Sequence, residues 1–321
     1  MSELPVGRVL RVDAKVVHVD LEDGVVHASP RGQLFEDLQG QKNPIAVGDF
    51  VRVSLSGDPV GVEEVLERRN YLGRVASSHD PREQVLVSNV DRLYVVASVA
   101  KPGFSSNRTD RILAACTWHE IPVTLVLNKI DLADPEDVDA IRATYEAVPI
   151  QVLETCAKDG RGVDTLAAQL EGCVSVFYGP SGAGKSTLAN WIQPGLKLRE
   201  GKISNYWKQG RHTTSYSQAH RLEMGGWLVD TPGIRVFRLH GVKRTVLRDL
   251  FPDFEAFQTE CRFDGCTHDH EPECMVADAV ETGRLAATRY ASYLEMLDEM
   301  DPDLAPDMSQ PLDDEDDLAD A

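Results

Sequence analysis

The sequence predicts a multidomain protein with an OB-type β-barrel at its N-terminal end, a central α/β domain, and a small helical domain near its C-terminal end. Three observations support this fold class. Short valine-rich segments fill residues 1–70, strands and helices alternate from Asp91, and cysteines cluster with a histidine between Cys261 and Cys274. Each pattern is typical of a different architecture. We therefore expect domains over residues 1–70, 71–240 and 241–300, and a tail over residues 301–321.

The N-terminal segments predict the barrel. Turn residues separate five short stretches that alternate between apolar and polar side chains: 6–12, 15–21, 24–28, 46–55 and 61–66. Five such strands favour a barrel of the OB type, whose sheet face and loops often bind oligonucleotides. A fold alone does not define a function, so a structural or protein-contact role of the barrel stays open. Residues 71–90 are polar and are expected to form a connector.

The central segment alternates between strand and helix patterns. Strands are expected at residues 93–97, 123–127, 150–153, 175–178 and 227–229. One helix would run through Cys116 with Asn107 or Thr109 as its cap. Further helices are expected at 135–147 and 163–170. This alternation predicts a mainly parallel sheet that helices cover on both faces.

Composition limits the functional classes. The chain has 321 residues, 42% of them hydrophobic, which suffices for two or three domains with their own cores. It contains no run of about 18 apolar residues and no signal-peptide pattern. We therefore expect a cytoplasmic monomer without a membrane segment. The formal net charge is −19, of which −10 remains for residues 1–300 once the nine acidic residues of the tail are set aside. Any surface that binds nucleic acid would be a local basic patch.

A glycine-rich motif lies between an expected strand and an expected helix. It comprises Gly179, Pro180, Ser181, Gly182, Ala183, Gly184, Lys185, Ser186 and Thr187. A buried strand before the motif and a helix after it are the context that a phosphate-binding loop requires. Its glycines let the backbone wrap around a phosphate chain, so that N–H groups point at the oxygens. Lys185 would contact the β- and γ-phosphates, and the Ser186 hydroxyl would bind Mg²⁺.

Two earlier loops carry groups that recognise a guanine base. The first follows the strand at 123–127 and contains Asn128, Lys129 and Asp131. Its carboxylate accepts hydrogen bonds from guanine N1–H and the exocyclic amine, a donor pair that adenine lacks. Asn128 would join this loop to the phosphate loop, and the Lys129 stem would lie along the ring. The second loop contains Cys156, Ala157 and Lys158. There a backbone N–H would meet guanine O6, and the lysine would cover the base.

Two later segments complete the set. Asp230 follows the strand at 227–229 and would hold Mg²⁺ through water. The Gly233 N–H would meet the γ-phosphate, so that this segment responds to hydrolysis. In the polar loop between the phosphate loop and Asp230, either Thr213 or Thr214 would complete the Mg²⁺ shell, and the sequence does not choose between them.

These five elements are the motifs of GTPases in an unusual order, because the base loops precede the phosphate loop. The chain therefore resembles a circularly permuted P-loop GTPase. Over about residues 5–295 it is similar to the ribosome small-subunit-dependent GTPase A family. The resemblance implies GTP/GDP and Mg²⁺ as ligands and hydrolysis of GTP. It also implies a role in maturation of the small ribosomal subunit, whose rRNA the protein binds and which stimulates hydrolysis.

One position departs from Ras-like enzymes. Ile234 stands where those enzymes have a glutamine that orients the attacking water. Intrinsic turnover should therefore be slow, with His212 and His220 as candidate polar substitutes. The departure keeps open a second function, that of an RNA-binding assembly factor whose bound nucleotide is structural. A third reading, an ATP-using enzyme, is disfavoured by the guanine-type loop at Asn128.

The C-terminal segment contains soft metal ligands. Three thiolates and an imidazole within fourteen residues supply the shell of a closed structural Zn²⁺ site: Cys261, Cys266, His268 and Cys274. His270 is an alternative ligand, although the family pattern favours His268. Amphipathic helices are expected at 242–250 and 277–297, and by resemblance this domain helps to bind rRNA. The acidic tail from residue 301 is expected to be disordered.

Overall fold

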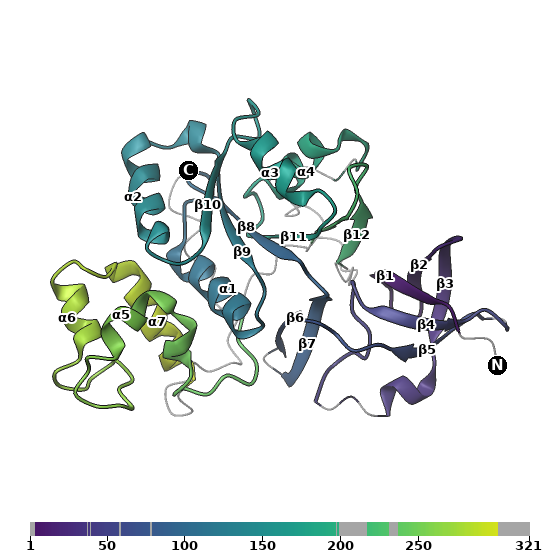
Figure 1. The fold of residues 1–321 in the computed structure, drawn as a ribbon, viewed down its shortest axis with the longest axis horizontal. Coiled ribbons are helices and arrows are strands. Elements are labelled where there is room, and N and C mark those ends of the chain that lie inside the picture. The colour runs from purple at the N-terminus through teal and green to yellow at the C-terminus, as the bar shows by residue number, and fades with distance from the viewer. Residues whose placement is uncertain are drawn as a thin grey trace.

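The computed structural model describes residues 4–36, 38, 40–57, 59–77, 79–196, 198, 217–230 and 237–300. The N-terminal barrel and the C-terminal helical domain lie at opposite ends of the long axis, with the α/β domain between and above them (Figure 1). The expectation for the acidic tail concerns residues outside this described part of the chain.

Five strands close the N-terminal barrel. They are β1 (Val6–Val12), β2 (Val17–Leu21), β3 (Gly24–Pro30), β4 (Phe50–Ser54) and β5 (Gly61–Val65). Their order is β1-β2-β3-β5-β4, and β4 pairs back onto β1. Alternate valines such as Val9, Val19 and Val53 are fully buried inside. The OB-type barrel predicted from the alternating segments is confirmed. A single turn of 3₁₀ helix, η1 (Gly32–Phe35), lies between β3 and β4.

The predicted connector at 71–90 is wrong, because these residues form an antiparallel hairpin of β6 (Tyr71–Ser77) and β7 (Asp80–Ser88). One face of the hairpin contributes Leu72 and Val87 to the core of the α/β domain. The polar residues that give the segment its loop-like composition are contiguous, at 77–84 around the turn of the hairpin. This polar run interrupts the alternation of the two strands, so composition alone hides the hairpin.

The central sheet has the order β10-β9-β8-β11-β13-β12. Its strands are β8 (Arg92–Ser98), β9 (Val123–Asn128), β10 (Gln151–Thr155), β11 (Val174–Tyr178), β12 (Gln218–Arg221) and β13 (Trp227–Asp230). All neighbours pair in parallel except β12, which is antiparallel to β13. The mainly parallel sheet is confirmed. The four-residue strand β12 was not expected, because it is too short to give a periodic signal.

Helices cover both faces of this sheet, as predicted. They are α1 (Ser106–Trp118), α2 (Pro135–Glu146), α3 (Val163–Leu170) and α4 (Lys185–Ile192). Alternate residues of each strand enter separate cores. Val95 packs with α1 and α2, whereas Val96 packs with α3 and α4. Helices α1 and α2 lie on one side of the sheet and α3 and α4 on the other (Figure 1). Short 3₁₀ turns, η2 (Ile130–Leu132) and η3 (Pro194–Leu196), follow β9 and α4.

The start of α1 differs from the prediction. Its N-cap is Ser105, whose side chain accepts from the Arg108 N–H, and neither Asn107 nor Thr109 caps it. Asn107 instead bonds Glu295 in the C-terminal domain, and Thr109 is buried. Five cap-type residues lie within positions 105–110, so the choice between them depends on these tertiary contacts.

The C-terminal domain is built from short helices. They are η6 (Leu247–Leu250), η7 (Pro252–Phe254), α5 (Glu255–Gln258), α6 (Met275–Glu281) and α7 (Ala287–Asp298). Both helix predictions need correction. Residues 242–250 contain only one 3₁₀ turn, and the stretch 277–297 is broken after Glu281. Gly283, with a φ of +70°, provides the left-handed conformation that ends α6.

A buried arginine of α7 attaches this domain to the α/β domain. Arg289 is 1% exposed and contacts Asp110 of α1 at 2.7 Å and Asp253 of η7 at 2.6 Å. Arg111 of α1 adds two hydrogen bonds to Glu299, at 2.7 and 2.6 Å. Paired charges at such depth are tolerated only where their hydrogen bonds are satisfied on several sides, so the docking geometry is closely defined.

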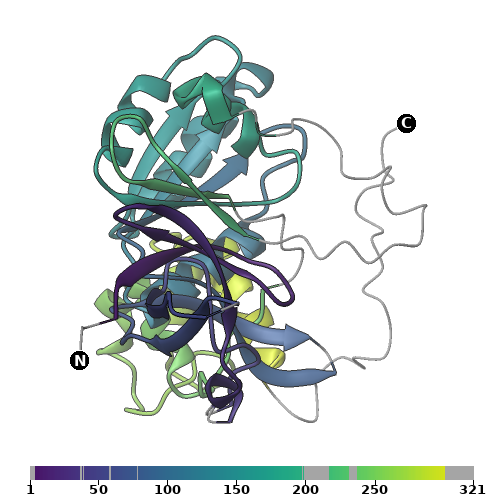
Figure 2. The same cartoon turned by 90° about the vertical axis from the view of Figure 1, so that its right-hand side faces the viewer.

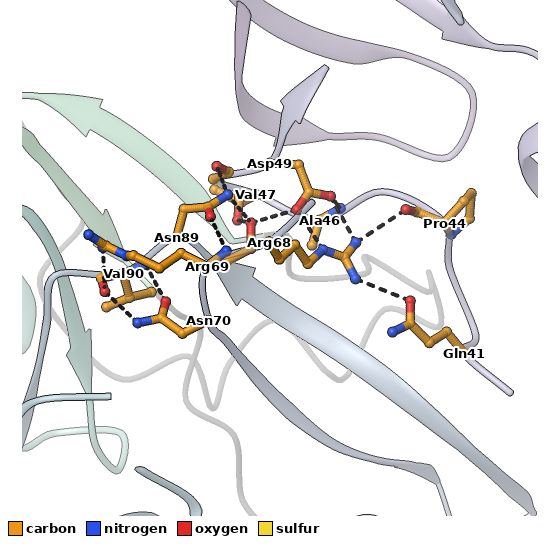
Figure 3. A network of polar contacts seen from close by, with 12 residues as sticks. Gln41, Pro44, Ala46, Val47, Asp49, Arg68, Arg69, Asn70, Asn89 and Val90 are labelled. Atoms are coloured by element: carbon orange, nitrogen blue, oxygen red, sulfur yellow. Dashed lines mark hydrogen bonds and ion pairs between the residues drawn. The ribbon is translucent and has the colours of Figure 1, made fainter. Parts of the chain in front are cut away.

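A second buried ion pair holds the barrel (Figure 3). Asp49 lies directly before β4 and is fully buried. Its carboxylate accepts hydrogen bonds from Arg68 Nε at 2.7 Å and from Arg68 Nη2 at 2.9 Å. Ser88, at the end of the hairpin, donates to the same carboxylate at 2.6 Å. The barrel is also joined to the outer strand of the central sheet, since Arg11 of β1 pairs with Gln218 of β12. Figure 2 shows the barrel, in purple, below the α/β domain.

We predict that Arg68→Met lowers the free energy of unfolding by about 3 to 5 kcal/mol, because it leaves the Asp49 carboxylate buried without its cation. Urea denaturation measures the loss. The matched control is Arg52→Met, which breaks the 2.9 Å pair with Glu64 on the barrel surface. That pair is solvent-exposed, so its loss should cost less than about 1 kcal/mol. Equal effects of both substitutions would contradict the role assigned to Asp49 and Arg68.

Candidate nucleotide and metal sites

The glycine-rich motif lies between β11 and α4, as its sequence context predicted. β8, β9, β10, β11 and β13 run parallel, so their carboxyl ends share one edge of the sheet, and the motif is at this edge. Gly184 has a φ of +98°, and a methyl group placed on it would lie 2.2 Å from Asn128 Nδ2. The close approach of the first base loop to the phosphate loop therefore requires glycine at this position.

Lys185 opens α4 and turns back over its own loop. Its Nζ donates to the carbonyl oxygens of Gly179 at 2.7 Å and Pro180 at 3.0 Å. Burial lowers the pKa of Lys185, and the charge of Asp230 opposes this shift. The ammonium group thus lies against the first residues of the loop, where it can neutralise the negative charge of a bound phosphate.

Ser186 and Asp230 lie at the same edge. Ser186 is in the first turn of α4, and Asp230 is the last residue of β13, paired in register with Phe177 of β11. Burial raises the pKa of the Asp230 carboxyl, and the charges of Lys185 and His220 oppose the rise. A hydroxyl and a carboxylate are the oxygen ligands that Mg²⁺ prefers, so the two residues fit a magnesium site.

Asn128 connects three loops. Its side chain is fully buried, and Nδ2 donates to the carbonyl oxygen of Ala183 in the phosphate loop at 2.8 Å. Its Oδ1 accepts from Thr155 Oγ1 at 3.1 Å and from the Ala157 N–H at 3.3 Å in the second base loop. The structure therefore brings together loops that lie up to 55 residues apart in the chain.

The remaining base-loop residues surround the same position. Lys158 Nζ lies 3.9 Å from a carboxylate oxygen of Asp131, and Lys129 adopts a left-handed conformation with a φ of +65°. The Lys129 ammonium donates to the Lys101 carbonyl. Burial lowers the pKa of Lys129, and the charge of Asp131 opposes the change. Cys156 is fully buried at the start of the second loop.

Sequence reasoning assigned no role to two contributors. Thr155, the last residue of β10 and the first of the second base loop, fixes Asn128 through its hydroxyl, a role that the sequence does not indicate. The segment after β8 also reaches the phosphate loop, because a methyl group placed on Gly182 would lie 3.4 Å from Pro102 Cδ. These residues are about 80 positions apart, and only the fold brings them together.

The switch residues of the prediction lie outside the described part of the chain: His212, Thr213, Thr214, Gly233 and Ile234. The other candidate histidine, His220, is on β12 and is half-buried. Burial lowers its pKa, and the charge of Asp230 opposes the shift. His220 therefore lies near the carboxylate predicted to hold Mg²⁺.

The four predicted zinc ligands converge. The ligand atoms of Cys261, Cys266, His268 and Cys274 all lie within 4.8 Å of one another. His268 Nδ1 faces the sulfur atoms of Cys274 at 3.4 Å and Cys261 at 3.6 Å. His270, the alternative ligand, points away and pairs with Asp269 at 3.2 Å. Three sulfurs and one imidazole nitrogen at this spacing fit the shell of a structural Zn²⁺.

This site is surrounded by aromatic side chains. His268 is fully buried, and its ring lies against Phe254 and Tyr293, with centroids 6.2 and 6.3 Å away. The Tyr290 hydroxyl donates to the His268 carbonyl at 2.6 Å. Because Tyr290 and Tyr293 belong to α7, the metal ligands and the helix that carries Arg289 form one unit.

Base loops that precede the phosphate loop in the chain, but meet it at one sheet edge, define a circularly permuted P-loop GTPase. Comparisons with known proteins agree. A family model described as RsgA GTPase matches residues 65–240. Since that match covers more than half of the chain, the protein belongs to the RsgA GTPase family.

Three similar proteins illustrate the relationship. The small ribosomal subunit biogenesis GTPase RsgA of Chlorobaculum parvum is 37% identical over 313 residues, covering 94% of this chain and 100% of the relative. The crystal structure of YjeQ from Thermotoga maritima has a TM-score of 0.71 at 32% identity, over 92% of this chain and 98% of that one. YloQ, described as a circularly permuted GTPase, has a TM-score of 0.65 at 28% identity, over 92% and 95% of the two chains.

None of the helices in the described ranges is both long and apolar enough to span a membrane.

Proposed function

We propose that this GTPase acts during maturation of the small ribosomal subunit, binds its rRNA, and is stimulated by it. Membership of the RsgA GTPase family makes the chain a GTP hydrolase. The partner is inferred from the relatives, which are named small ribosomal subunit biogenesis GTPases. The observation that carries the nucleotide-binding part of the proposal is the buried Asn128, which joins both base loops to the phosphate loop at the carboxyl ends of the strands.

Guanine recognition is assigned to the two base loops. The Asp131 carboxylate would accept from guanine N1–H and the exocyclic amine, and the Ala157 N–H would donate to O6. Asp131 now has the Lys158 ammonium 3.9 Å away, and its side chain is 18% exposed, so a base can reach it. The aliphatic stems of Lys129 and Lys158 would then cover the two faces of the base.

Phosphate binding is assigned to residues 179–187, with Lys185 at their centre. Its two hydrogen bonds to backbone carbonyls would be exchanged for bonds to phosphate oxygens, in which donor and acceptor are both charged. Ser186 and Asp230 would hold Mg²⁺, which neutralises the charge that develops on the leaving phosphate. These side chains would position the phosphates for attack by water.

The switch residues extend the proposal into sequence outside the described ranges. Thr213 or Thr214 would close the Mg²⁺ shell, and Gly233 would contact the γ-phosphate. Because Ile234 cannot orient water, hydrolysis by the free protein should be slow. The small ribosomal subunit would then complete or order the site.

The flanking domains are assigned to the ribosomal contact. We propose three domains, over residues 1–70, 71–240 and 241–300, with the barrel and the zinc-binding domain gripping rRNA. We propose that it acts in the cytoplasm, where such a factor would meet assembling ribosomes, and that it acts as a monomer.

Phosphate release from GTP and from ATP, with and without purified small ribosomal subunits, tests the function. We expect GTP-selective release that the subunits stimulate at least tenfold and that disappears in Lys185→Ala. The alternative function is that of an RNA-binding factor whose bound nucleotide is structural. It is considered because Ile234 replaces the glutamine that orients water in Ras-like enzymes. Binding of GTP with no release in the presence of subunits would favour that candidate and contradict the proposal.

The metal is proposed to be a single structural Zn²⁺. Replacing Cys274 by serine should reduce bound zinc from one ion per chain to nearly none, as measured by elemental analysis. The thermal unfolding temperature of the C-terminal domain should fall as well, because structural zinc supplies about 10–16 kcal/mol of folding free energy. The matched control is Cys173→Ser, since Cys173 is a free, half-buried thiol outside the cluster. Full zinc occupancy in Cys274→Ser would show that the ligand set is wrong.

A further inference from the structure

A tryptophan of the phosphate-binding helix contacts the second base loop. Trp191 lies near the end of α4, and 45% of its surface is exposed. A methyl group placed on Gly160 would lie 2.5 Å from Cζ2 and 2.9 Å from Cη2 of the indole. The ring is therefore stacked closely against the backbone of Gly160, where no other residue type would fit without displacing it.

The loop under this ring is internally stiff. The Gly160 N–H donates to the Cys156 carbonyl at 2.9 Å, and the Cys156 N–H donates to the Arg161 carbonyl at 2.9 Å. Asp159 adds two contacts to Arg161, at 3.1 Å to its N–H and 3.0 Å to Nε. A displacement of Gly160 is therefore passed on to Cys156 and to the Ala157 N–H that follows it.

From outside, the loop is held by the first base loop and by α4. In the first base loop, Asn128 Oδ1 accepts the Ala157 N–H at 3.3 Å, and Asp131 lies 3.9 Å from the Lys158 ammonium. The contact from α4 is the indole of Trp191. Helices α3 and α4 share a buried core that includes Leu166 and Leu188, so the backbone that carries Trp191 is held firmly by packing. Asn128 fixes the loop on the side of the first base loop and the indole supports it on the side of α4, so the position of the Ala157 N–H depends on both contacts.

We propose that Trp191 is a positioning residue for purine recognition, and that it fixes the second base loop so that the Ala157 N–H discriminates at position 6 of the base. The inference rests on the proposed assignment of Ala157 to guanine O6. Base specificity then has two separate sources. Asp131 recognises N1–H and the exocyclic amine, whereas Trp191, acting through the loop, determines how strongly the protein prefers a base with an oxygen at position 6.

Two analogues separate these sources. 6-Thio-GDP replaces O6 by sulfur, a larger atom and a weaker hydrogen-bond acceptor, and IDP lacks only the exocyclic amine. Dissociation constants for GDP and both analogues would be measured by titration calorimetry. The proteins are the wild type, Trp191→Ala, Trp191→Phe and Trp118→Ala. Trp118 ends α1 and is 38% exposed, so it is a matched control for loss of a surface indole.

We expect the preference of Trp191→Ala for GDP over 6-thio-GDP to fall by about fivefold, the equivalent of one neutral hydrogen bond. Its preference for GDP over IDP should not change. Trp191→Phe keeps a flat ring on Gly160 and should restore most of the lost discrimination, and Trp118→Ala should match the wild type.

Two results would overturn the inference in distinguishable ways. Equal weakening of all three nucleotides in Trp191→Ala would show that the indole only stabilises the fold, while leaving the base-loop assignment intact. A wild-type protein that does not distinguish GDP from either analogue would refute the base-loop assignment itself, and the role of Trp191 with it.

Discussion

The nucleotide site depends on one buried side chain amide. Asn128 donates to the phosphate loop through Nδ2 and accepts from the second base loop through Oδ1, so a single group sets the distances between three loops. A buried amide whose donor and acceptor are both used is costly to disturb, since any displacement leaves a polar atom unpaired. Thr155 and Gly184 are explained by this constraint, because the former orients the amide and the latter makes room for it.

The constraint is spatial and is indifferent to chain order. In a parallel sheet, the loops at the carboxyl ends of neighbouring strands lie together wherever the chain begins. Here β9 and β10 precede β11 in the chain. Both flanking domains contact the GTPase fold directly. The barrel is held by Asp49 and Arg68 and touches β12, and the C-terminal domain is held on α1 by Arg289.

Local patterns made much of this predictable from sequence. The strand–loop–helix context of residues 174–192, the alternating barrel strands and the spacing of Cys261, Cys266, His268 and Cys274 are each encoded within a short segment. The hairpin β6–β7, the strand β12 and the Ser105 cap were missed for local reasons: polar residues surround the hairpin turn, β12 is too short to give a periodic signal, and several cap-type residues precede α1. Thr155 and the contact between Trp191 and Gly160 carry no signal in the sequence, because their partners are distant in the chain.

The central claim is that the loop after β9 recognises guanine although it precedes the phosphate loop. Its most direct test is the affinity of Asp131→Asn for GDP and for XDP, whose base carries a keto oxygen in place of the exocyclic amine. An asparagine amide can donate to that oxygen, whereas it cannot accept both guanine donors. The account predicts that the variant loses affinity for GDP and comes to prefer XDP. An unchanged preference for GDP would contradict it.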